Sequence, residues 1–187
     1  MTIVCAFHKL GYGTVIGSDN QETLGYEALP LMNGKWVIGS HWAAGIGGEA
    51  KAFDLITTNS QALLNTDITP QTFISKYLAI IREDGWEPIK EQGVPIIFNV
   101  RIILASACEI YDISGNGHVR RSEWVAIGSG SEFATGASYV LRQQNSSPET
   151  IVRTAVRAAI QFSTTCGGEV WTRSLRHSSC SSALTYC

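Results

Sequence analysis

Short β-branched and apolar runs dominate the first fifty positions of the chain. Residues 3–7 and 14–18 flank a segment, 8–13, whose two glycines suit a tight turn, so the pattern predicts a β-hairpin. A second pair of strands is predicted at 35–39 and 42–46. Strands therefore open the domain.

The spacing of apolar residues changes to a helical period after Gly48. Apolar positions recur every three or four residues over 50–64, which predicts a first helix. A second helix is predicted over 70–84, because Thr69 is a suitable N-cap and Pro70 suits the first helical position. Asp84-Gly85 predicts its end.

Two further helices are predicted near the C-terminus, over 131–144 and 148–163. The inward face predicted for the first consists of Phe133, Ala134, Ala137, Val140 and Leu141. The inward face predicted for the second consists of Val152, Ala155, Val156, Ala159 and Ile160. Arg153 and Arg157 lie away from that face, which indicates a solvated stripe rather than a ligand clamp.

The remaining apolar runs predict strands over 95–106, 109–113, 124–128 and 169–175, with a loop over 86–94 and a Ser-rich tail over 176–187. Blocks of strands alternate with blocks of two helices, which is typical of α+β folds. We therefore expect one domain, 1–187, with two stacked antiparallel sheets and a helix pair outside each.

Composition narrows the class of protein. The 187 residues are 44% hydrophobic and 16% charged, enough for a core, and the net charge of −2 gives no basic footprint for nucleic acid. Apolar runs are too short to span a bilayer. Because Met1-Thr2 opens the chain without a basic region, we expect no secretory signal and a cytoplasmic location.

Five cysteines are scattered without CxxC spacing. An odd, scattered set argues against a disulfide framework and against a zinc site, so no metal is expected, and nothing indicates an organic cofactor. Cys5 and Cys108 lie in apolar runs and are predicted to be core residues. Cys180 and Cys187 lie in the polar tail, where free thiols are expected rather than a disulfide.

The candidates for chemistry lie near the N-terminus. Removal of Met1 exposes Thr2, whose hydroxyl is a nucleophile and whose α-amine, with a pKa near 8, is a base. Asp19 ends one predicted strand and Lys35 begins another, so the two could meet beside Thr2. The same residues also fit an ordinary N-terminal threonine and a surface ion pair of little energy.

Several blocks of sequence resemble the proteasome β-subunits and HslV, a family of self-compartmentalising threonine peptidases. Residues 2–7 and 15–19 resemble the first hairpin of both, and 21–25 is similar to HslV. Further similar blocks follow in the family's order at 45–53, 111–117, 126–131 and 166–168. The resemblance covers about residues 2–175 and implies an N-terminal nucleophile hydrolase fold, a four-layer αββα sandwich.

The resemblance also implies roles for individual residues. Thr2 falls on the family's nucleophile, Asp19 on its aspartate and Lys35 on its lysine. Gly48 falls on the glycine whose N–H forms the oxyanion hole, and Ser129 on the serine that binds the threonine amine.

Two positions match the substrate-binding segment and two depart from the family pattern. Ile46, near the wall of the S1 pocket, and Gly47 fall on that segment. Ser163 stands where proteasome subunits have an aspartate, and Cys166 stands where they have a serine. These two replacements imply a weaker network around the amine.

The resemblance implies one subunit of a homo-oligomeric ring or double ring that cleaves polypeptides, supplied by an ATPase that unfolds substrate. One alternative is a structural or scaffold ring protein, such as a phage assembly component, that keeps the fold with Met1 retained and no activity. A second alternative is another N-terminal nucleophile amidase acting on a small amide.

Overall fold

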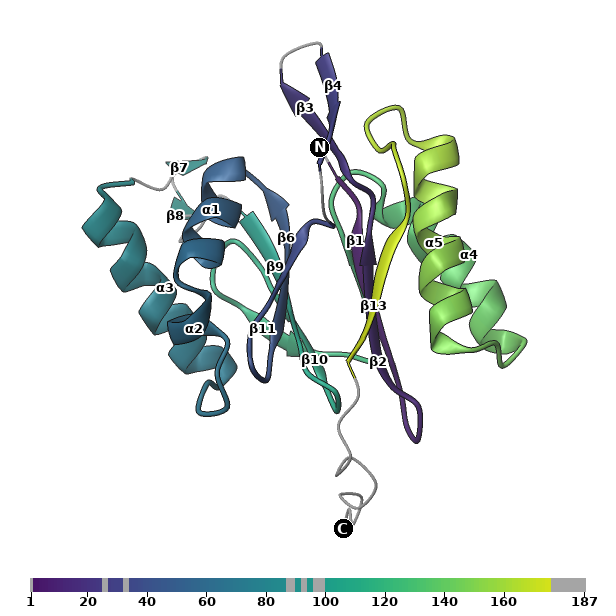
Figure 1. The fold of residues 1–187 in the computed structure, drawn as a ribbon, viewed down its shortest axis with the longest axis horizontal. Helices are drawn as coiled ribbons and strands as arrows, with labels where there is room; N and C mark the ends of the chain where they lie inside the picture. The colour runs from purple at the N-terminus through teal and green to yellow at the C-terminus, as the bar shows by residue number, and fades with distance from the viewer. Residues whose placement is uncertain are drawn as a thin grey trace.

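The computed structural model describes residues 2–24, 27–31, 34–86, 90–91, 94–95 and 100–175. Two antiparallel sheets lie face to face, and helices cover the outer face of each (Figure 1). The four layers are helix, sheet, sheet, helix. The predicted α+β class and the αββα arrangement are confirmed.

The first sheet has the strand order β12-β1-β2-β13. Its strands are β12 (Trp124–Ile127), β1 (Val4–Lys9), β2 (Gly13–Ser18) and β13 (Trp171–Leu175). β1 and β2 form the predicted hairpin, in which Val4 pairs with Ser18. Because β1 also pairs with β12, the start of the chain lies inside the sheet rather than at its edge.

The second sheet has the order β11-β10-β9-β6-β5. Its strands are β11 (Val119–Arg121), β10 (Ile110–Ile113), β9 (Val100–Ala105), β6 (Ala43–Gly48) and β5 (Trp36–Ile38). The facing surfaces of the two sheets share a hydrophobic core formed by Val4, Ala6, Ile16, Ala43, Ile103, Ala105, Ile110, Val125 and Ile127.

Three helices cover the outer face of the second sheet: α1 (Ala50–Thr58), α2 (Ser60–Leu63) and α3 (Pro70–Asp84). The single helix predicted over 50–64 is interrupted at Asn59, whose backbone leaves helical geometry. The N-terminus of α3 is as predicted: the Thr69 hydroxyl accepts from the Thr72 N–H, and Gly85 ends the helix in the left-handed conformation.

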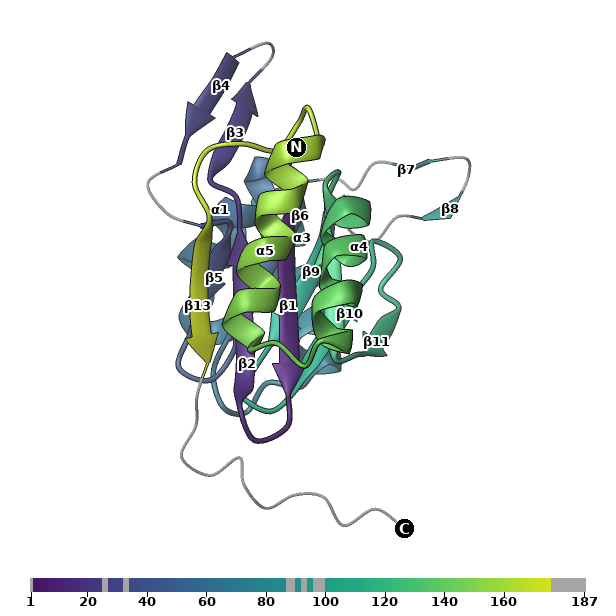
Figure 2. The same cartoon turned by 90° about the vertical axis from the view of Figure 1, so that its right-hand side faces the viewer.

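Helices α4 (Ser131–Gln143) and α5 (Pro148–Phe162) lie side by side over the first sheet (Figure 2). The predicted inward face of α5 is confirmed, since Val152, Ala155, Val156 and Ala159 are all fully buried. The face predicted for α4 is partly wrong. Ala134 and Ser138 are buried, whereas Phe133 and Val140 are 42% and 54% exposed.

Several short strands were not predicted. β3 (Gln21–Leu24) and β4 (Glu27–Pro30) form a separate hairpin after β2, and β11 follows the predicted turn at 115–117. The predicted loop over 86–94 contains β7 (Lys90–Glu91), which pairs with β8 (Val94–Pro95). The tail over 176–187 lies outside the described residues.

The prediction for one cysteine is wrong. Cys5 is fully buried, as expected, but Cys108 is exposed and disulfide-bonded. Cys180 and Cys187 lie outside the described residues. Of the helices in the described ranges, none combines the length and apolarity that a bilayer crossing requires.

Candidate active site

Thr2 lies two residues before Val4, the first residue of β1, at one end of the interface between the two sheets. Continuing the antiparallel register of β1 brings its first residues beside Asp19, which follows β2, and beside Ser129, which follows β12. The Asp19 N–H donates to the Ile3 carbonyl oxygen over 3.3 Å, which extends the β1–β2 pairing. Thr2 is only 7% exposed.

The Asp19 carboxylate joins the parts of this site. Its Oδ1 atom accepts from the Thr2 hydroxyl and from the Ile3 N–H, each over 3.1 Å, and from the Lys35 ammonium over 2.8 Å. Its Oδ2 atom accepts from the Gly167 N–H over 3.2 Å. Asp19 is fully buried, and these four donors replace the water that a carboxylate loses on burial.

Lys35 reaches the site from the second sheet, just before β5. Its N–H donates to the Ser18 hydroxyl over 2.8 Å, and its carbonyl oxygen accepts from the Ile46 N–H over 3.2 Å. The backbone of Lys35 is thus tied to both sheets. Its ammonium forms a buried salt bridge with Asp19 and lies beside the Thr2 hydroxyl, because both bind the same oxygen atom.

The loop after β12 holds the backbone of Thr2. The Ser129 hydroxyl and the Gly130 N–H each donate to the Thr2 carbonyl oxygen over 3.4 Å. Gly128 has φ of +93°, and a Cβ atom there would overlap the Thr2 carbonyl oxygen. Only glycine therefore lets this loop approach Thr2 so closely.

The end of β6 passes along the other side of Thr2. A Cβ atom on Gly47 would lie 3.5 Å from Cγ2 of Thr2. Gly48 follows with φ of +143°, a conformation that favours glycine, and it is exposed. Ile46 points the other way, into the core beneath α1 and α3, and is 5% exposed.

A chain of hydroxyl groups continues from Ser129 to the end of α5. The Ser129 oxygen lies 2.6 Å from the Thr165 hydroxyl, which lies 2.9 Å from the Ser163 hydroxyl. The Cys166 sulfur lies 3.9 Å from the Ser129 oxygen and is buried. Ser163 and Cys166 therefore both lie in the group of side chains around Ser129 and Thr165.

The structure brings most of the predicted site residues together and adds others. Thr2, Asp19, Lys35 and Ser129 form one connected network, and Gly47 and Gly48 lie beside it. Sequence analysis missed three residues. Ser18 contacts Lys35, Thr165 contacts Ser129, and Gly167 contacts Asp19. The run of hydroxyl residues 163–165 before Cys166 was the available signal for Thr165.

The thiol closest to the site in sequence is unsuited to chemistry. Cys5 lies in β1 and faces α5, and burial raises the pKa of its thiol far above the ordinary value. It therefore stays protonated and unreactive. Within the described ranges, no group of three or more His, Cys, Asp or Glu side chains is arranged to hold a metal ion.

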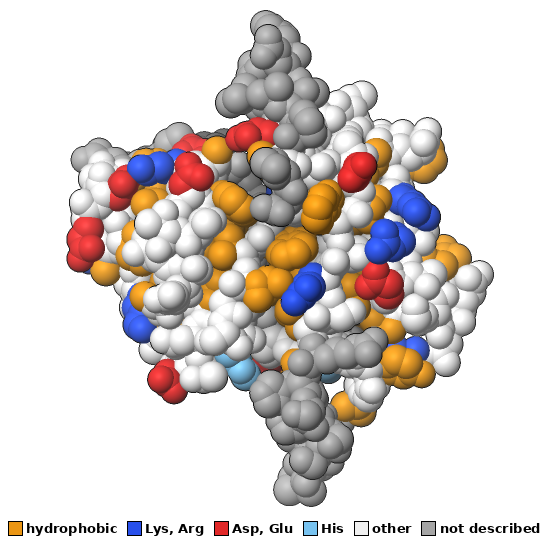
Figure 3. Space-filling model, viewed as in Figure 1, with side chains coloured by type: hydrophobic (Ala, Val, Ile, Leu, Met, Phe, Trp, Pro, Cys, Tyr) orange, Lys and Arg blue, Asp and Glu red, His pale blue; other side chains and the backbone are white. Residues whose placement is uncertain are grey.

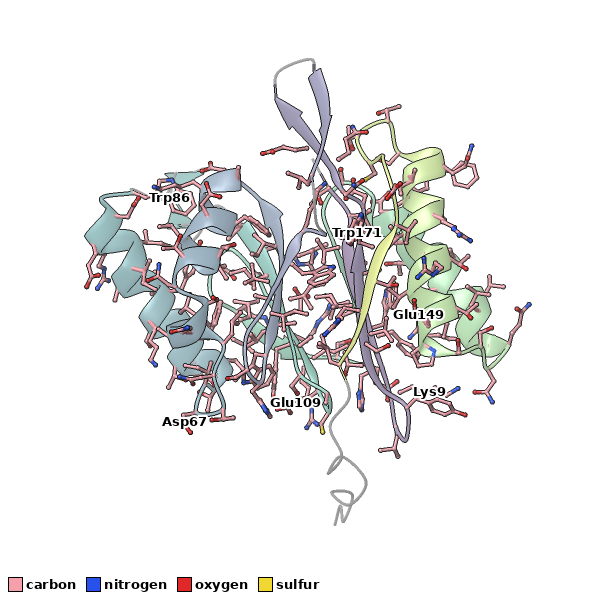
Figure 4. The ribbon with its side chains drawn as sticks, in the orientation of Figure 1. Lys9, Asp67, Trp86, Glu109, Glu149 and Trp171 are labelled. Atoms are coloured by element: carbon pink, nitrogen blue, oxygen red, sulfur yellow. The ribbon has the colours of Figure 1, made fainter. Side chains whose placement is uncertain are left out.

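An open groove of about 710 Å³ lies elsewhere, between α5 and the segment 168–170. Charged side chains of both signs gather over this face (Figure 3). Glu149 of α5 points toward β13, as Figure 4 shows, and its Oε1 atom accepts from Arg153 over 2.8 Å and from Thr172 over 2.6 Å. The lining does not include Thr2, so the groove is separate from the site.

No protein-family model matches the sequence, and no curated protein matches it. Solved structures do match. BPH of Thiobacillus denitrificans in complex with epoxomicin has a TM-score of 0.76 at 22% identity, covering 94% of this chain and 100% of that chain. A second structure of BPH gives 0.75 at 20% identity, covering 92% and 98%.

Eukaryotic HslV from Trypanosoma brucei is also similar, with a TM-score of 0.66 at 22% identity, covering 94% of this chain and 100% of that chain. The resemblance to HslV found in the sequence is therefore confirmed at the level of the fold, over nearly the whole chain. The fold of this chain is the one that BPH and HslV share.

Proposed function

We propose that this chain is a subunit of a threonine-type endopeptidase, in which removal of Met1 makes Thr2 the N-terminal nucleophile. One observation carries the proposal: the Thr2 hydroxyl and the Lys35 ammonium converge on one oxygen of the fully buried Asp19 carboxylate. A buried ion pair of this kind is a costly way to stabilise a fold, which favours a role in chemistry.

The first half of the reaction forms an ester. The Thr2 oxygen attacks the carbonyl carbon of a peptide bond, and its proton passes to the Thr2 α-amine, directly or through one water. The Gly48 N–H, at the end of β6, receives the oxyanion. Collapse of the intermediate breaks the C–N bond, and the α-ammonium gives its proton to the leaving amine.

The second half releases the product. Water attacks the ester carbon, the α-amine accepts the proton of that water, and the Thr2 oxygen leaves and is reprotonated. The positive charge of Lys35 repels a proton on the nearby α-amine, and Asp19 holds the Lys35 ammonium in place over 2.8 Å. No metal or organic cofactor takes part in these steps.

The resemblance supports the rest of the proposal. A peptidase of this type acts on polypeptides from inside a closed homo-oligomeric ring, to which an ATPase delivers unfolded chains. Ring contacts repeat by rotation, so the particle mass is a multiple of the 20.3 kDa subunit. Light scattering that gave a stable monomer would contradict this part.

The proposal is tested with two preparations of one chain, made as a cleavable fusion that leaves either Thr2 or Met1 as the first residue. We expect hydrolysis of fluorogenic peptides only when Thr2 is first. Thr2→Ser keeps a hydroxyl and an amine and retains part of the activity, whereas Thr2→Ala retains none. Equal, background rates from all four proteins would leave the silent scaffold as the better account.

A further inference from the structure

We propose that Thr165 is a positioning residue of this site, the middle member of a chain of three neutral hydroxyl groups that orients Ser129 toward Thr2. The inference rests on the proposed function and deepens it. Thr165 was not singled out in the sequence, and the resemblance assigns it no role. Its contacts carry the argument.

One hydrogen bond in this chain has a defined direction. Each hydroxyl has one proton to donate. Since the Thr2 carbonyl oxygen can only accept, the Ser129 hydroxyl donates to it over 3.4 Å. Both hydroxyl–hydroxyl contacts allow the matching order, in which Ser129 accepts from Thr165 over 2.6 Å and Thr165 accepts from Ser163 over 2.9 Å.

The far end of the chain is fixed by the backbone. Ser163 is the C-cap of α5, and its oxygen accepts from the Thr165 N–H over 3.4 Å. The Ser163 N–H in turn donates to the Ala159 carbonyl oxygen over 2.9 Å. Thr165 is therefore held by its backbone and its side chain together, with its hydroxyl directed at Ser129.

This arrangement leaves a lone pair of the Ser129 oxygen available for the α-amine of Thr2. Ser129 is exposed, and without Thr165 its side chain is free to rotate away from Thr2. Thr165 thus stabilises the one rotamer of Ser129 that contacts Thr2. It acts through Ser129 and touches no reacting atom.

The three hydroxyl groups of Ser129, Thr165 and Ser163 also carry no charge. A carboxylate at the Ser163 position would favour the protonated α-amine, because opposite charges attract, and would raise the amine pKa. Three neutral hydroxyls orient the amine without that effect. The site therefore keeps its base unprotonated at a lower pH than it would with an aspartate at position 163.

The experiment uses the Met1-free protein and measures kcat and KM for a peptide, together with the rate of modification by an epoxyketone. Thr165→Val removes the hydroxyl with little change in shape. We expect kcat to fall about fivefold with KM unchanged, the equivalent of one net hydrogen bond. Thr165→Ser restores the hydroxyl and most of the rate.

Thr164→Val is the matched control, because Thr164 is the exposed neighbour of Thr165. It should behave as the wild type. Melting temperatures well above the assay temperature in all three variants would show that the loss of rate is not a loss of fold. Ser163→Asp supplies a second readout: the acid limb of the kcat/KM profile should move to higher pH.

The outcomes separate the two proposals. An active wild type with Thr165→Val equal to it, or with Thr165→Ser as slow as Thr165→Val, would overturn the role of Thr165 and leave the peptidase intact. An unmoved pH profile in Ser163→Asp would overturn the argument from charge. A silent Met1-free wild type would overturn the peptidase and the positioning role with it.

Discussion

The Lys35 ammonium donates to Oδ1 of Asp19 over 2.8 Å, and neither side chain has more than a tenth of its surface exposed. The two residues come from different sheets, because Asp19 follows β2 and Lys35 precedes β5. The ion pair therefore ties the two layers together beside Thr2, which precedes β1. Stability and chemistry depend on the same contact.

Lys35→Met should abolish peptidase activity and also lower the free energy of unfolding by about 3 kcal/mol or more, because the Asp19 carboxylate stays buried without its cation. Urea denaturation measures the loss. Lys51→Met is the control: Lys51 pairs with Asp84 in a half-exposed salt bridge, and its loss should cost under about 1 kcal/mol. Equal stability of the two variants would contradict the importance of burial.

Gly128→Ala should displace Thr2, because the new methyl group would overlap the Thr2 carbonyl oxygen. We expect loss of activity and of modification at Thr2, together with a lower midpoint of urea unfolding.

Gly85→Ala separates the clash from backbone strain: Gly85 has φ of +75°, yet a Cβ atom there would meet nothing within 4 Å. It should cost about 1 kcal/mol and leave activity unchanged. An active Gly128→Ala would show that the loop does not hold Thr2.

Val156→Asp should destabilise the fold by several kcal/mol, because Val156 is fully buried between α5 and the first sheet and the carboxylate has no partner there. Arg157→Ala, one position along on the exposed face, should change stability by about 0.5 kcal/mol or less. Thermal unfolding compares the two. A Val156→Asp protein with the same melting temperature as the wild type would mean that another face of α5 packs on the sheet.

His8 predicts a pH dependence of stability. Burial lowers the pKa of its imidazole below the ordinary 6.5, while Glu123 opposes the shift. Below pH about 6.5 the unfolded chain binds a proton that the folded chain does not, so the contribution of His8 is present above that pH and is lost as the pH falls.

His8→Asn removes this titration and retains a side-chain amide that can hydrogen-bond Thr14, whose oxygen lies 3.0 Å from Nδ1 of His8. Urea unfolding at pH 7 and pH 5.5 measures the difference. The wild type should lose more stability on acidification than the variant. A larger loss in the variant would reverse the sign of the argument.

The sequence predicted the core of this fold well where one face of an element is strongly apolar. The apolar stripe of α5 is an example, because Val152 and Val156 lie on the same side of the helix and both are fully buried. The prediction was partly wrong for α4: Ala134 is buried as predicted, but so is Ser138, while Phe133 and Val140 are exposed. Small residues let α4 lie close to α5, and hydropathy alone cannot distinguish that close contact from exposure.

The site was predicted in part, and for two different reasons. The predicted strand ends allowed Asp19 and Lys35 to meet beside Thr2, and the resemblance assigned all three residues to one site. Thr165 and Gly167 were missed, because their roles depend on how the segment after α5 turns back toward Asp19. The hydroxyl run 163–165 and the block 166–168 were visible in the sequence, but their approach to Ser129 and Asp19 was not.

The central claim is that Thr2, freed of Met1, is the nucleophile. Mass spectrometry of the intact protein after incubation with epoxomicin, which BPH of Thiobacillus denitrificans binds in its solved complex, tests it most directly. An epoxyketone needs both a hydroxyl and a free α-amine to form its adduct. We predict loss of Met1 and one inhibitor per chain, mapped to Thr2 by peptide analysis and absent from Thr2→Ala. Met1-free protein that gained no mass, or gained it at another residue, would contradict the account.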